Sequence, residues 1–382
     1  MQTFIMPRDV YHGHGALTAL RRLNGQRALL VTGVEAMRRN GFLQRAQHFL
    51  REAGLETTIY SGIARDASEG LLLAGVKVMR ERKPDWVVAL GGGAVLDAAK
   101  LMCVLYEHPG LALDNLIQPE GLPWMRRMVR LAAVSTTLGG GSAVSAYAVL
   151  PRLRGGLTRS VSDSQLVPDM AIFDPDLPIM LPRSQTVAGG IGTLTLAVEA
   201  YASGEHSDLT DPLALQAIHL FADALQGATE GSPSACERMQ YASCLAALAA
   251  SNASMGLAHT LALALSAAFY RPIPYGHAAA MCLPAAIRSG AGVSGARYAA
   301  LARHLRLGAG GAPALAKWVQ DWCARLELAP ALRAYGAVEA EFLAKAPALA
   351  GHVIEQLRRA QKPGAVTQKE VEELLRSIYY GG

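Results

Sequence analysis

The stretch that decides the fold is Gly91-Gly92-Gly93-Ala94-Val95-Leu96-Asp97-Ala98-Ala99-Lys100. It follows an apolar run over 85–90 whose length and Val/Trp content are typical of a buried strand, and residues 94–106 continue with a helical pattern. Glycines at a strand-to-helix turn let backbone N–H groups approach a ligand, and the helix N-terminus adds a positive dipole end. The stretch predicts a pyrophosphate site, with a tight packing turn as the alternative.

Predicted strands and helices alternate around this turn. The strands cover 27–32, 57–60, 85–90 and 129–135, and the helices between them cover 41–53, 71–82 and 94–106. This alternation predicts an α/β domain with a Rossmann-like, doubly wound parallel sheet. After Pro182 only helical patterns follow, over 188–202, 211–225, 236–251, 257–269, 312–325, 340–348 and 368–379. We expect a dinucleotide-binding domain over residues 1–180 and an all-helical domain over residues 181–382.

A second loop rich in glycine and hydroxyl groups, over residues 135–145, follows the predicted strand 129–135. Hydroxyls beside flexible backbone suit a phosphate and ribose cradle, whereas entry into a hairpin is the alternative because 147–150 is strand-like. Two such loops at the carboxyl ends of strands in one sheet favour the cradle. The residues predicted to bind the cofactor here are Gly91, Gly92, Gly93, Asp97, Lys100, Thr136, Thr137 and Ser142.

Composition and charge exclude several classes of partner. The net charge of +5 comes from 36 Lys+Arg against 31 Asp+Glu, and no basic run is interleaved with aromatics, so we expect no nucleic-acid partner. No stretch of 18 apolar residues occurs, and we expect no membrane association and a cytoplasmic location. The five cysteines have no metal-like spacing and are expected to be reduced thiols.

Five motifs occur in a fixed order along the chain. They are G-G-G-x-x-x-D-x-A-K at 91–100, T-T-x-G-x-G-S at 136–142, P-D-x-A-I-x-D-P at 168–175, A-x-E-A-Y at 197–201 and G-L-A-H at 256–259. Through them the chain resembles the iron-containing (group III) alcohol dehydrogenases, which share the fold of dehydroquinate synthase. The resemblance implies a nicotinamide cofactor in the first domain, a small carbonyl or alcohol substrate in the interdomain cleft, and a homodimer.

The resemblance also implies a divalent metal, usually iron. In the family it is held by an aspartate and a histidine of a G-M-D-A-L-T-H-A-x-E-A-Y helix and by the histidines of G-L-x-H and I-P-H-G. Only His259 is retained here, because Gly192, Leu196 and Tyr275 stand at the other three positions. A catalytic divalent ion needs about three protein ligands beside an open position. We therefore expect no metal.

Without a metal, another group must polarise the substrate oxygen and protonate it. The candidates are Tyr275, His259 and His277, and the alternatives are that Tyr275 only fills the empty site and that the histidines are satisfied polar residues of an inherited cleft. An anion site is predicted around Arg159 and Arg271, with solvated surface charge as the alternative.

The residue after the first predicted strand bears on cofactor choice. In the resembled family an aspartate at this position marks members that prefer NAD, and such a carboxylate repels a 2′-phosphate. Gly33 stands there in this chain, and although Glu35 restores some negative charge, Arg38 and Arg39 offset it. The alternatives are that Gly33 serves a tight turn and that the arginines are solvated. We expect NADP(H) in preference to NAD(H).

Two hypotheses about function follow. The first is an NADPH-dependent, alcohol dehydrogenase-like reductase that transfers hydride to a small aldehyde or keto substrate, neutral or anionic, without a catalytic metal. The alternative is a non-catalytic or repurposed nucleotide-binding descendant of the iron-containing alcohol dehydrogenases.

Overall fold

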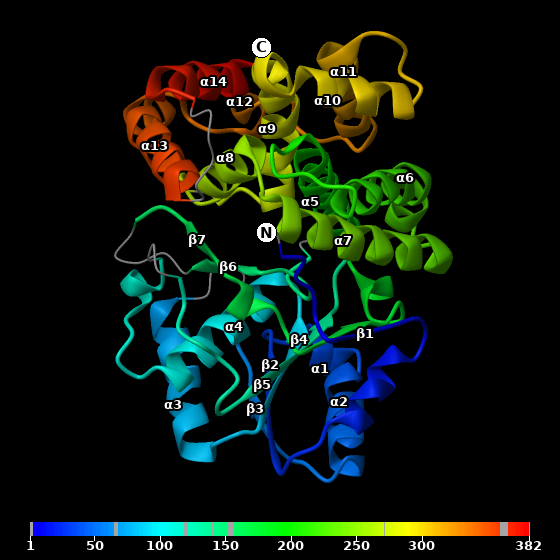
Figure 1. The fold of residues 1–382 in the computed structure, drawn as a ribbon, viewed down its shortest axis with the longest axis vertical. Helices are drawn as coiled ribbons and strands as arrows, with labels where there is room; N and C mark the ends of the chain where they lie inside the picture. The colour runs from blue at the N-terminus through cyan, green and yellow to red at the C-terminus, as the bar shows by residue number, and fades with distance from the viewer. Residues whose placement is uncertain are drawn as a thin grey trace.

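A computed structural model describes residues 3–64, 68–117, 121–139, 141–150, 156–270, 272–359 and 366–381. Within these ranges the chain forms an α/β domain, lower in Figure 1, and a helical domain above it. The fold class expected from the sequence is confirmed. Gly140 of the second loop and Arg271 of the predicted anion site lie outside the described residues.

A six-stranded sheet forms the centre of the α/β domain. In spatial order its strands are β1 (Asp9–His12), β8 (Met170–Phe173), β5 (Arg130–Ser135), β4 (Trp86–Gly91), β2 (Arg27–Thr32) and β3 (Glu56–Tyr60). All neighbouring pairs are parallel. Strand order reverses between β2 and β4, where Thr32 is in register with Leu90. Ligands of doubly wound sheets bind at this kind of reversal, so Gly33 and Gly91 end their strands at the expected place.

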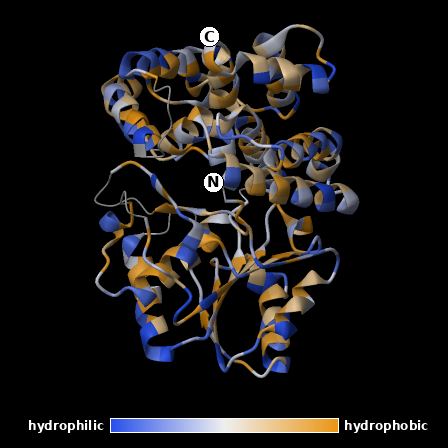
Figure 2. Ribbon diagram, viewed as in Figure 1, coloured by the Kyte–Doolittle hydropathy of each residue, from blue (hydrophilic) through white to orange (hydrophobic). Residues whose placement is uncertain are grey.

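Helices cover both faces of this sheet. They are α1 (Ala36–Arg39), α2 (Phe42–Glu52), α3 (Glu69–Arg82) and α4 (Gly93–Glu107), with the short 3₁₀ helices η1 (Ala16–Arg22), η2 (Leu113–Leu116), η3 (Ser164–Leu166) and η4 (Pro178–Met180). Figure 2 shows hydrophobic residues along the strands and hydrophilic residues at the outer ends of α2 and α3. Helix α4 is buried on every side from Val95 to Tyr106, as expected of a helix that is apolar all round.

A two-stranded antiparallel ribbon, β6 (Tyr147–Leu150) and β7 (Arg159–Ser162), lies between α4 and the helical domain. The second glycine-rich loop therefore leads into a hairpin, as one of the two interpretations of the sequence predicted. The ribbon also joins the domains, because the Thr158 carbonyl oxygen lies 2.9 Å from Nε2 of His352 and the Ala146 N–H donates to Ser251 Oγ at 3.2 Å.

The second domain is helical throughout its described residues. Its helices are α5 (Arg183–Ala202), α6 (Thr210–Thr229), α7 (Pro233–Ala253), α8 (Leu257–Ser266), α9 (Tyr275–Ser289), α10 (Ala291–His304), α11 (Gly311–Arg325), α12 (Leu332–Tyr335), α13 (Glu339–Arg359) and α14 (Gln368–Tyr380). No single helix within the described ranges has the length and apolar character to cross a membrane; only α7 and α8 taken together, bent by 110°, meet both criteria.

Candidate active site

The glycine turn between β4 and α4 has no room for side chains. A Cβ on Gly91 would lie 2.5 Å from Cβ of Val95, and one on Gly92 would lie 2.8 Å from Cγ2 of Thr137. Real Cβ atoms do not approach other atoms this closely, so glycine is required at both positions. The turn leaves the N-terminus of α4 open to a ligand, which is the arrangement that binds phosphate groups in nucleotide-binding proteins.

The second loop packs directly on this turn. The Thr136 N–H donates to the Gly91 carbonyl oxygen at 3.1 Å, and Thr137 contacts Gly92 as described above. On the other side of the turn, a Cβ on Gly93 would lie 3.4 Å from Ser142 Oγ. The structure therefore brings together the glycines and the hydroxyl residues that the sequence predicts for the cofactor.

Asp97 and Lys100 lie beneath the cradle, and neither presents its charge to a ligand. The Lys100 ammonium donates to the carbonyl oxygens of Ser145 and Tyr147, both at 2.8 Å, and to Ser145 Oγ at 3.1 Å. Asp97 accepts the Val149 N–H at 3.1 Å. Burial raises the pKa of Asp97 to about 6 and lowers the pKa of Lys100 to about 8.

This position corrects the predicted role of the two residues. Because the three ammonium hydrogens of Lys100 have three acceptors inside the protein, they are not available to a cofactor phosphate. Asp97 and Lys100 instead fix α4 to the start of β6, and so hold the loop from Ser142 to Tyr147 in place.

The position of the family's metal is filled by a side chain. A Cβ on Gly192 would lie 3.1 Å from Cε1 of Tyr275, so the phenol ring covers the position from which the family's aspartate would extend. The Tyr275 hydroxyl lies 2.8 Å from Nδ1 of His259. Leu196, in place of the family's first histidine, is buried in the apolar core.

These residues do not fit a metal ion. Gly192 and Leu196 have no donor atoms, and nowhere in the described part of the chain do three or more His, Cys, Asp or Glu side chains converge as ligands. Burial, together with the nearby Tyr147 and Glu199, raises the pKa of Tyr275 well above its ordinary value. The phenol is therefore protonated at neutral pH and is not an anionic ligand.

Glu199 fixes the helix that carries His259. Its carboxylate accepts the backbone N–H groups of Gly256 at 3.0 Å, Ala258 at 2.6 Å and His259 at 3.0 Å, all in the first turn of α8. A Cβ on Gly256 would lie 2.3 Å from Oε1 of Glu199, so glycine is needed there too. The sequence marks Glu199 only as part of a family motif, and this positioning role was missed.

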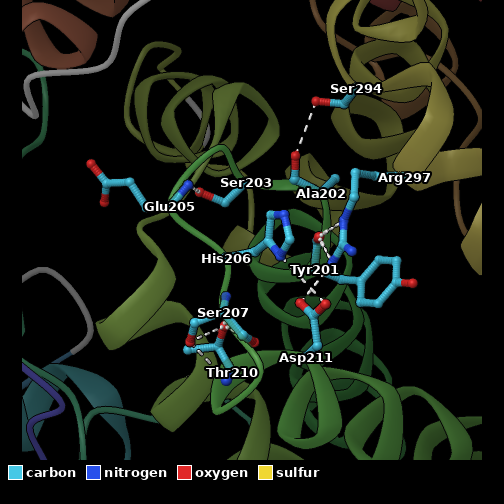
Figure 3. Close-up of polar contacts among 10 residues, drawn as sticks. All are labelled: Tyr201, Ala202, Ser203, Glu205, His206, Ser207, Thr210, Asp211, Ser294 and Arg297. Atoms are coloured by element: carbon cyan, nitrogen blue, oxygen red, sulfur yellow. Dashed lines mark hydrogen bonds and ion pairs between the residues drawn. The ribbon is translucent and has the colours of Figure 1, made fainter. Parts of the chain in front are cut away.

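The end of α5 is held just beyond Glu199 by a polar cluster (Figure 3). The Arg297 guanidinium lies over the Tyr201 ring, 3.9 Å from its centroid, and donates to the Tyr201 carbonyl oxygen and to Asp211 at 2.6 Å. Ser294 donates to the Ala202 carbonyl oxygen at 3.0 Å. Helix α10 thereby stabilises the end of the helix that carries Gly192 and Glu199.

A cavity of about 450 Å³ lies between the β6–β7 ribbon and helices α7, α8 and α13. Tyr147 and His259 both line it, with their rings edge to face and the centroids 5.7 Å apart. We expect from the sequence a cleft shared by Gly91, Thr136, His259 and Tyr275. Of these four residues only His259 lines this cavity, because Tyr275 lies on the other side of the imidazole, toward Gly192.

His277 and Arg159 lie elsewhere than predicted. His277 lies in the first turn of α9, two residues after Tyr275, and side chains two residues apart on a helix face different directions. The His277 ring packs edge-on against Tyr335, with 5.8 Å between the ring centroids. Arg159 pairs with Asp114 at 2.6 Å and is absent from the described lining of the cavity. The predicted anion site is therefore not formed by Arg159, and His277 is not part of the His259–Tyr275 pair.

Gly33 follows β2 at a position where a small side chain would be tolerated. A Cβ there would make ordinary contacts, 3.6 Å from the Ile63 carbonyl oxygen and 3.9 Å from Val95, and its φ is not positive. The turn therefore does not require glycine at this position, unlike the turn at Gly91. Arg38, in the short helix that follows, is exposed.

A glycine turn at the point where strand order reverses, together with a helical second domain, is typical of a two-domain nucleotide-binding protein. Residues 7–175 match the family model of iron-containing alcohol dehydrogenase, and residues 186–379 match the C-terminal model of the Fe-containing alcohol dehydrogenase family. The chain belongs to the iron-containing alcohol dehydrogenase family, and it is an oxidoreductase of the alcohol dehydrogenase type.

Similar proteins agree with this assignment. The chain is 34% identical to the NADPH-dependent butanol dehydrogenase of Clostridium saccharobutylicum, over 100% of this chain and 99% of that protein. It is 32% identical to the bifunctional aldehyde-alcohol dehydrogenase of Escherichia coli K12. That match includes 98% of this chain and 46% of the longer protein. The iron-containing alcohol dehydrogenase of Thermococcus thioreducens superposes with a TM-score of 0.89 and 29% identity, over 100% of both chains.

Proposed function

We propose that this protein is an NADPH-dependent reductase that transfers hydride to a small aldehyde or keto substrate without a catalytic metal. The observation that carries the proposal is the hydrogen bond of 2.8 Å between the Tyr275 hydroxyl and His259 Nδ1, formed where the family's metal ligands would meet. A hydrogen-bonded acid thus occupies the place of a Lewis acid.

The proton in this proposal comes from His259. Hydride moves from the nicotinamide to the carbonyl carbon, the C=O π bond breaks, and the oxygen gains negative charge. His259 lines the cavity and enters the reaction as the imidazolium. It gives the proton of Nε2, an atom that is buried in this structure, to that oxygen and keeps the Nδ1 proton, which it donates to Tyr275. Because burial raises the pKa of Tyr275, the phenol stays neutral and orients the ring. The products are the alcohol, NADP⁺ and a neutral imidazole.

The preference for NADPH has two supports. Gly33 places no carboxylate where it would repel a 2′-phosphate, and the exposed Arg38 lies five residues further on. The butanol dehydrogenase relative is NADPH-dependent by name. A cofactor bound at the Gly91 turn supplies the hydride, and the residues described here hold it and protonate the product.

The test is NADPH-dependent reduction of butanal in protein prepared without added metal, together with iron and zinc analysis. We expect turnover that a chelator does not change and far less than one ion per chain. Tyr275→Phe should lower kcat on the order of tenfold to a hundredfold with an unchanged NADPH dissociation constant, because only the partner of Nδ1 is lost. Turnover that a chelator abolishes and a metal restores would overturn the proposal.

Metal analysis needs one control. His219 and His304 form an exposed pair on α6 and α10 with their Nε2 atoms 2.8 Å apart, and such a pair can retain divalent ions during purification. Metal that disappears in His304→Ala while turnover persists belongs to this surface pair and not to the active site.

A further inference from the structure

The polar character of the cavity indicates which substrates it accepts. Its lining is rich in hydroxyl groups, contributed by Thr158, Ser160, Ser162, Ser251, Ser254 and Thr260. Its acidic residues are Asp163 and Glu205, its histidines are His259 and His352, and among the described lining residues there is no lysine or arginine. A cavity of about 450 Å³ has room for a small polar molecule.

Several of these polar groups already have partners inside the protein. Asp163 accepts the backbone N–H groups of Leu122 at 2.7 Å and Gln165 at 2.8 Å. Asn252 bonds both the N–H and the carbonyl oxygen of Ile5, at 2.6 and 2.8 Å. These residues shape the cavity, and their hydrogen bonds do not need a ligand.

Gln356 differs from them. It lies on α13 and lines the cavity, and its side-chain nitrogen is buried and makes no hydrogen bond to any residue that the structure describes. A buried amide without a partner destabilises a protein by about 1–3 kcal/mol, whereas a bound acceptor would remove that cost. Exchange of the amide nitrogen and oxygen would leave a buried acceptor at the same point.

Glu205 offers a second uncommitted group at the cavity mouth. It is exposed, and Figure 3 shows its side chain extending away from the polar cluster of His206 and Asp211. Its backbone N–H donates a hydrogen bond to Ser203 Oγ at 3.1 Å. Its carboxylate makes no ion pair within the described ranges, and the nearby ion pairs join His206 and Arg297 to Asp211. Glu205 therefore adds negative charge where a substrate enters.

We propose that this cavity selects a hydroxylated carbonyl substrate, with Gln356 and Glu205 as its specificity-determining residues. A hydroxyl both donates and accepts, so it satisfies the Gln356 amide in either orientation and donates to the Glu205 carboxylate. A carboxylate on the substrate would be repelled by Glu205 and Asp163. An ammonium only donates, so it leaves the Gln356 N–H without an acceptor in the amide orientation that the structure has. The inference rests on the proposed function for the reacting carbonyl, and it names the chemistry of the rest of the substrate.

The experiment compares four-carbon alcohols in the oxidation direction with NADP⁺. The set is butanol, butanetriol, a terminal hydroxybutanoate and aminobutanol, which differ in the groups remote from the reacting carbon. We expect kcat/KM for butanetriol about tenfold above butanol, from one or two added hydrogen bonds, and the lowest value for hydroxybutanoate. Butanetriol at or below butanol, or either charged substrate in first place, would overturn the inference.

Two variants locate the effect. Gln356→Leu and Glu205→Gln should each lower the butanetriol-to-butanol ratio by about threefold to tenfold. Asp208→Asn is the matched control, because it removes one negative charge from the same exposed loop outside the described cavity lining, and it should leave the ratio unchanged. An equal butanetriol-to-butanol ratio in the parent protein and in all three variants would show that neither Gln356 nor Glu205 determines specificity.

A binding measurement separates this inference from the proposed function. Calorimetric titration of NADP⁺-loaded protein with butanetriol and with butanol gives the same comparison without turnover. Tighter butanetriol binding without oxidation would contradict the proposed function and support this cavity assignment. Oxidation of all neutral alcohols with equal kcat/KM would leave the proposed function standing and refute the assignment.

Discussion

The turn at Gly91 keeps one sequence feature of the family, whereas the site at Gly192 has lost another. At Gly91 the pattern is intact, and Cβ distances of 2.5 and 2.8 Å show that no other residue fits at Gly91 and Gly92. At Gly192 three of four ligand positions have changed, and a tyrosine ring from α9 covers the gap.

The difference follows from what each site needs. A phosphate cradle is made of backbone N–H groups, and only glycine lets the backbone approach closely enough. A Lewis acid supplies positive charge at a substrate oxygen, and a hydrogen-bonded imidazolium supplies charge at the same kind of atom. Backbone geometry has no substitute among side chains, whereas in the proposed mechanism an imidazolium substitutes for the charge of a metal.

The largest expected effect tests whether the replaced site is catalytic. His259→Gln should lower kcat by about a thousandfold, because an amide can bond Tyr275 but holds no transferable proton. NADPH binding at the Gly91 turn should not change, because His259 is not part of that turn. Steady-state kinetics and fluorescence titration with NADPH measure the two quantities.

His277→Gln is the control for that change, since His277 packs against Tyr335. Its kcat should stay within about threefold of the parent protein, as is usual for a change outside the reacting groups. If His277→Gln were the more damaging substitution, the catalytic pair would have been assigned to the wrong histidine.

The second prediction tests whether the retained region depends on its buried ion pair. Lys100→Met should lower the free energy of unfolding by about 3 kcal/mol, because Asp97 is left buried without its counter-charge. Urea unfolding at neutral pH measures the loss. The double substitution Asp97→Asn with Lys100→Met should recover most of it, and a double variant as unstable as Lys100→Met would show that the ammonium's three hydrogen bonds matter more than the charge pair.

The third prediction concerns cofactor choice at Gly33. Gly33→Asp should weaken NADPH binding about tenfold relative to NADH, because the new carboxylate repels the 2′-phosphate. The ordinary contacts of a Cβ at this position mean that the substitution should fold without strain. Dissociation constants for both cofactors decide the matter, and tighter NADH binding by the parent protein would contradict the proposed preference.

The smallest effect is a pH dependence of stability from Asp97. Its pKa rises from 3.8 in the unfolded chain to about 6 in the folded protein, so between these values the folded state holds a proton that the unfolded state releases. The contribution of Asp97 to stability is therefore largest below about pH 4 and falls until about pH 6.

The measurement is the difference in unfolding free energy between the parent protein and Asp97→Asn. This difference should fall by on the order of 1 kcal/mol between mildly acidic and neutral pH. A difference that grows with pH would mean that Lys100 keeps Asp97 ionised throughout.

Sequence pattern predicted the sheet and the cradle well because both depend on local signals. The runs 27–32 and 147–150 coincide with β2 and β6, and the glycine loops fall at strand ends. Helix α9 was missed, since Pro284 lies within it and its start reads as a loop. The four-residue strands β1 and β8 were missed.

The proposed catalytic pair was named from the sequence, but its geometry was not predicted. Family motifs identify His259 and Tyr275, but the ring of Tyr275 over Gly192 depends on how α9 packs against α5, which no spacing encodes. Gln356 carried no signal at all. It lies beyond the predicted helix 340–348 and reaches the cavity only because α13 continues to Arg359.

The position of β1 has a consequence for how the chain is made. In the described sheet β1 pairs only with β8, which is the last strand of that sheet in chain order. Asp174 accepts the N–H groups of Gly15 and Leu17. The strand that pairs with β1 and the carboxylate of Asp174 do not exist until the ribosome has passed residue 174. Asn252, the partner of Ile5, is made later still. At about 5–20 residues per second the leading segment spends roughly ten seconds or more without its partners. During that interval the segment is exposed to chaperones and proteases, and a bulky tag fused ahead of β1 would interfere with the step that closes the sheet.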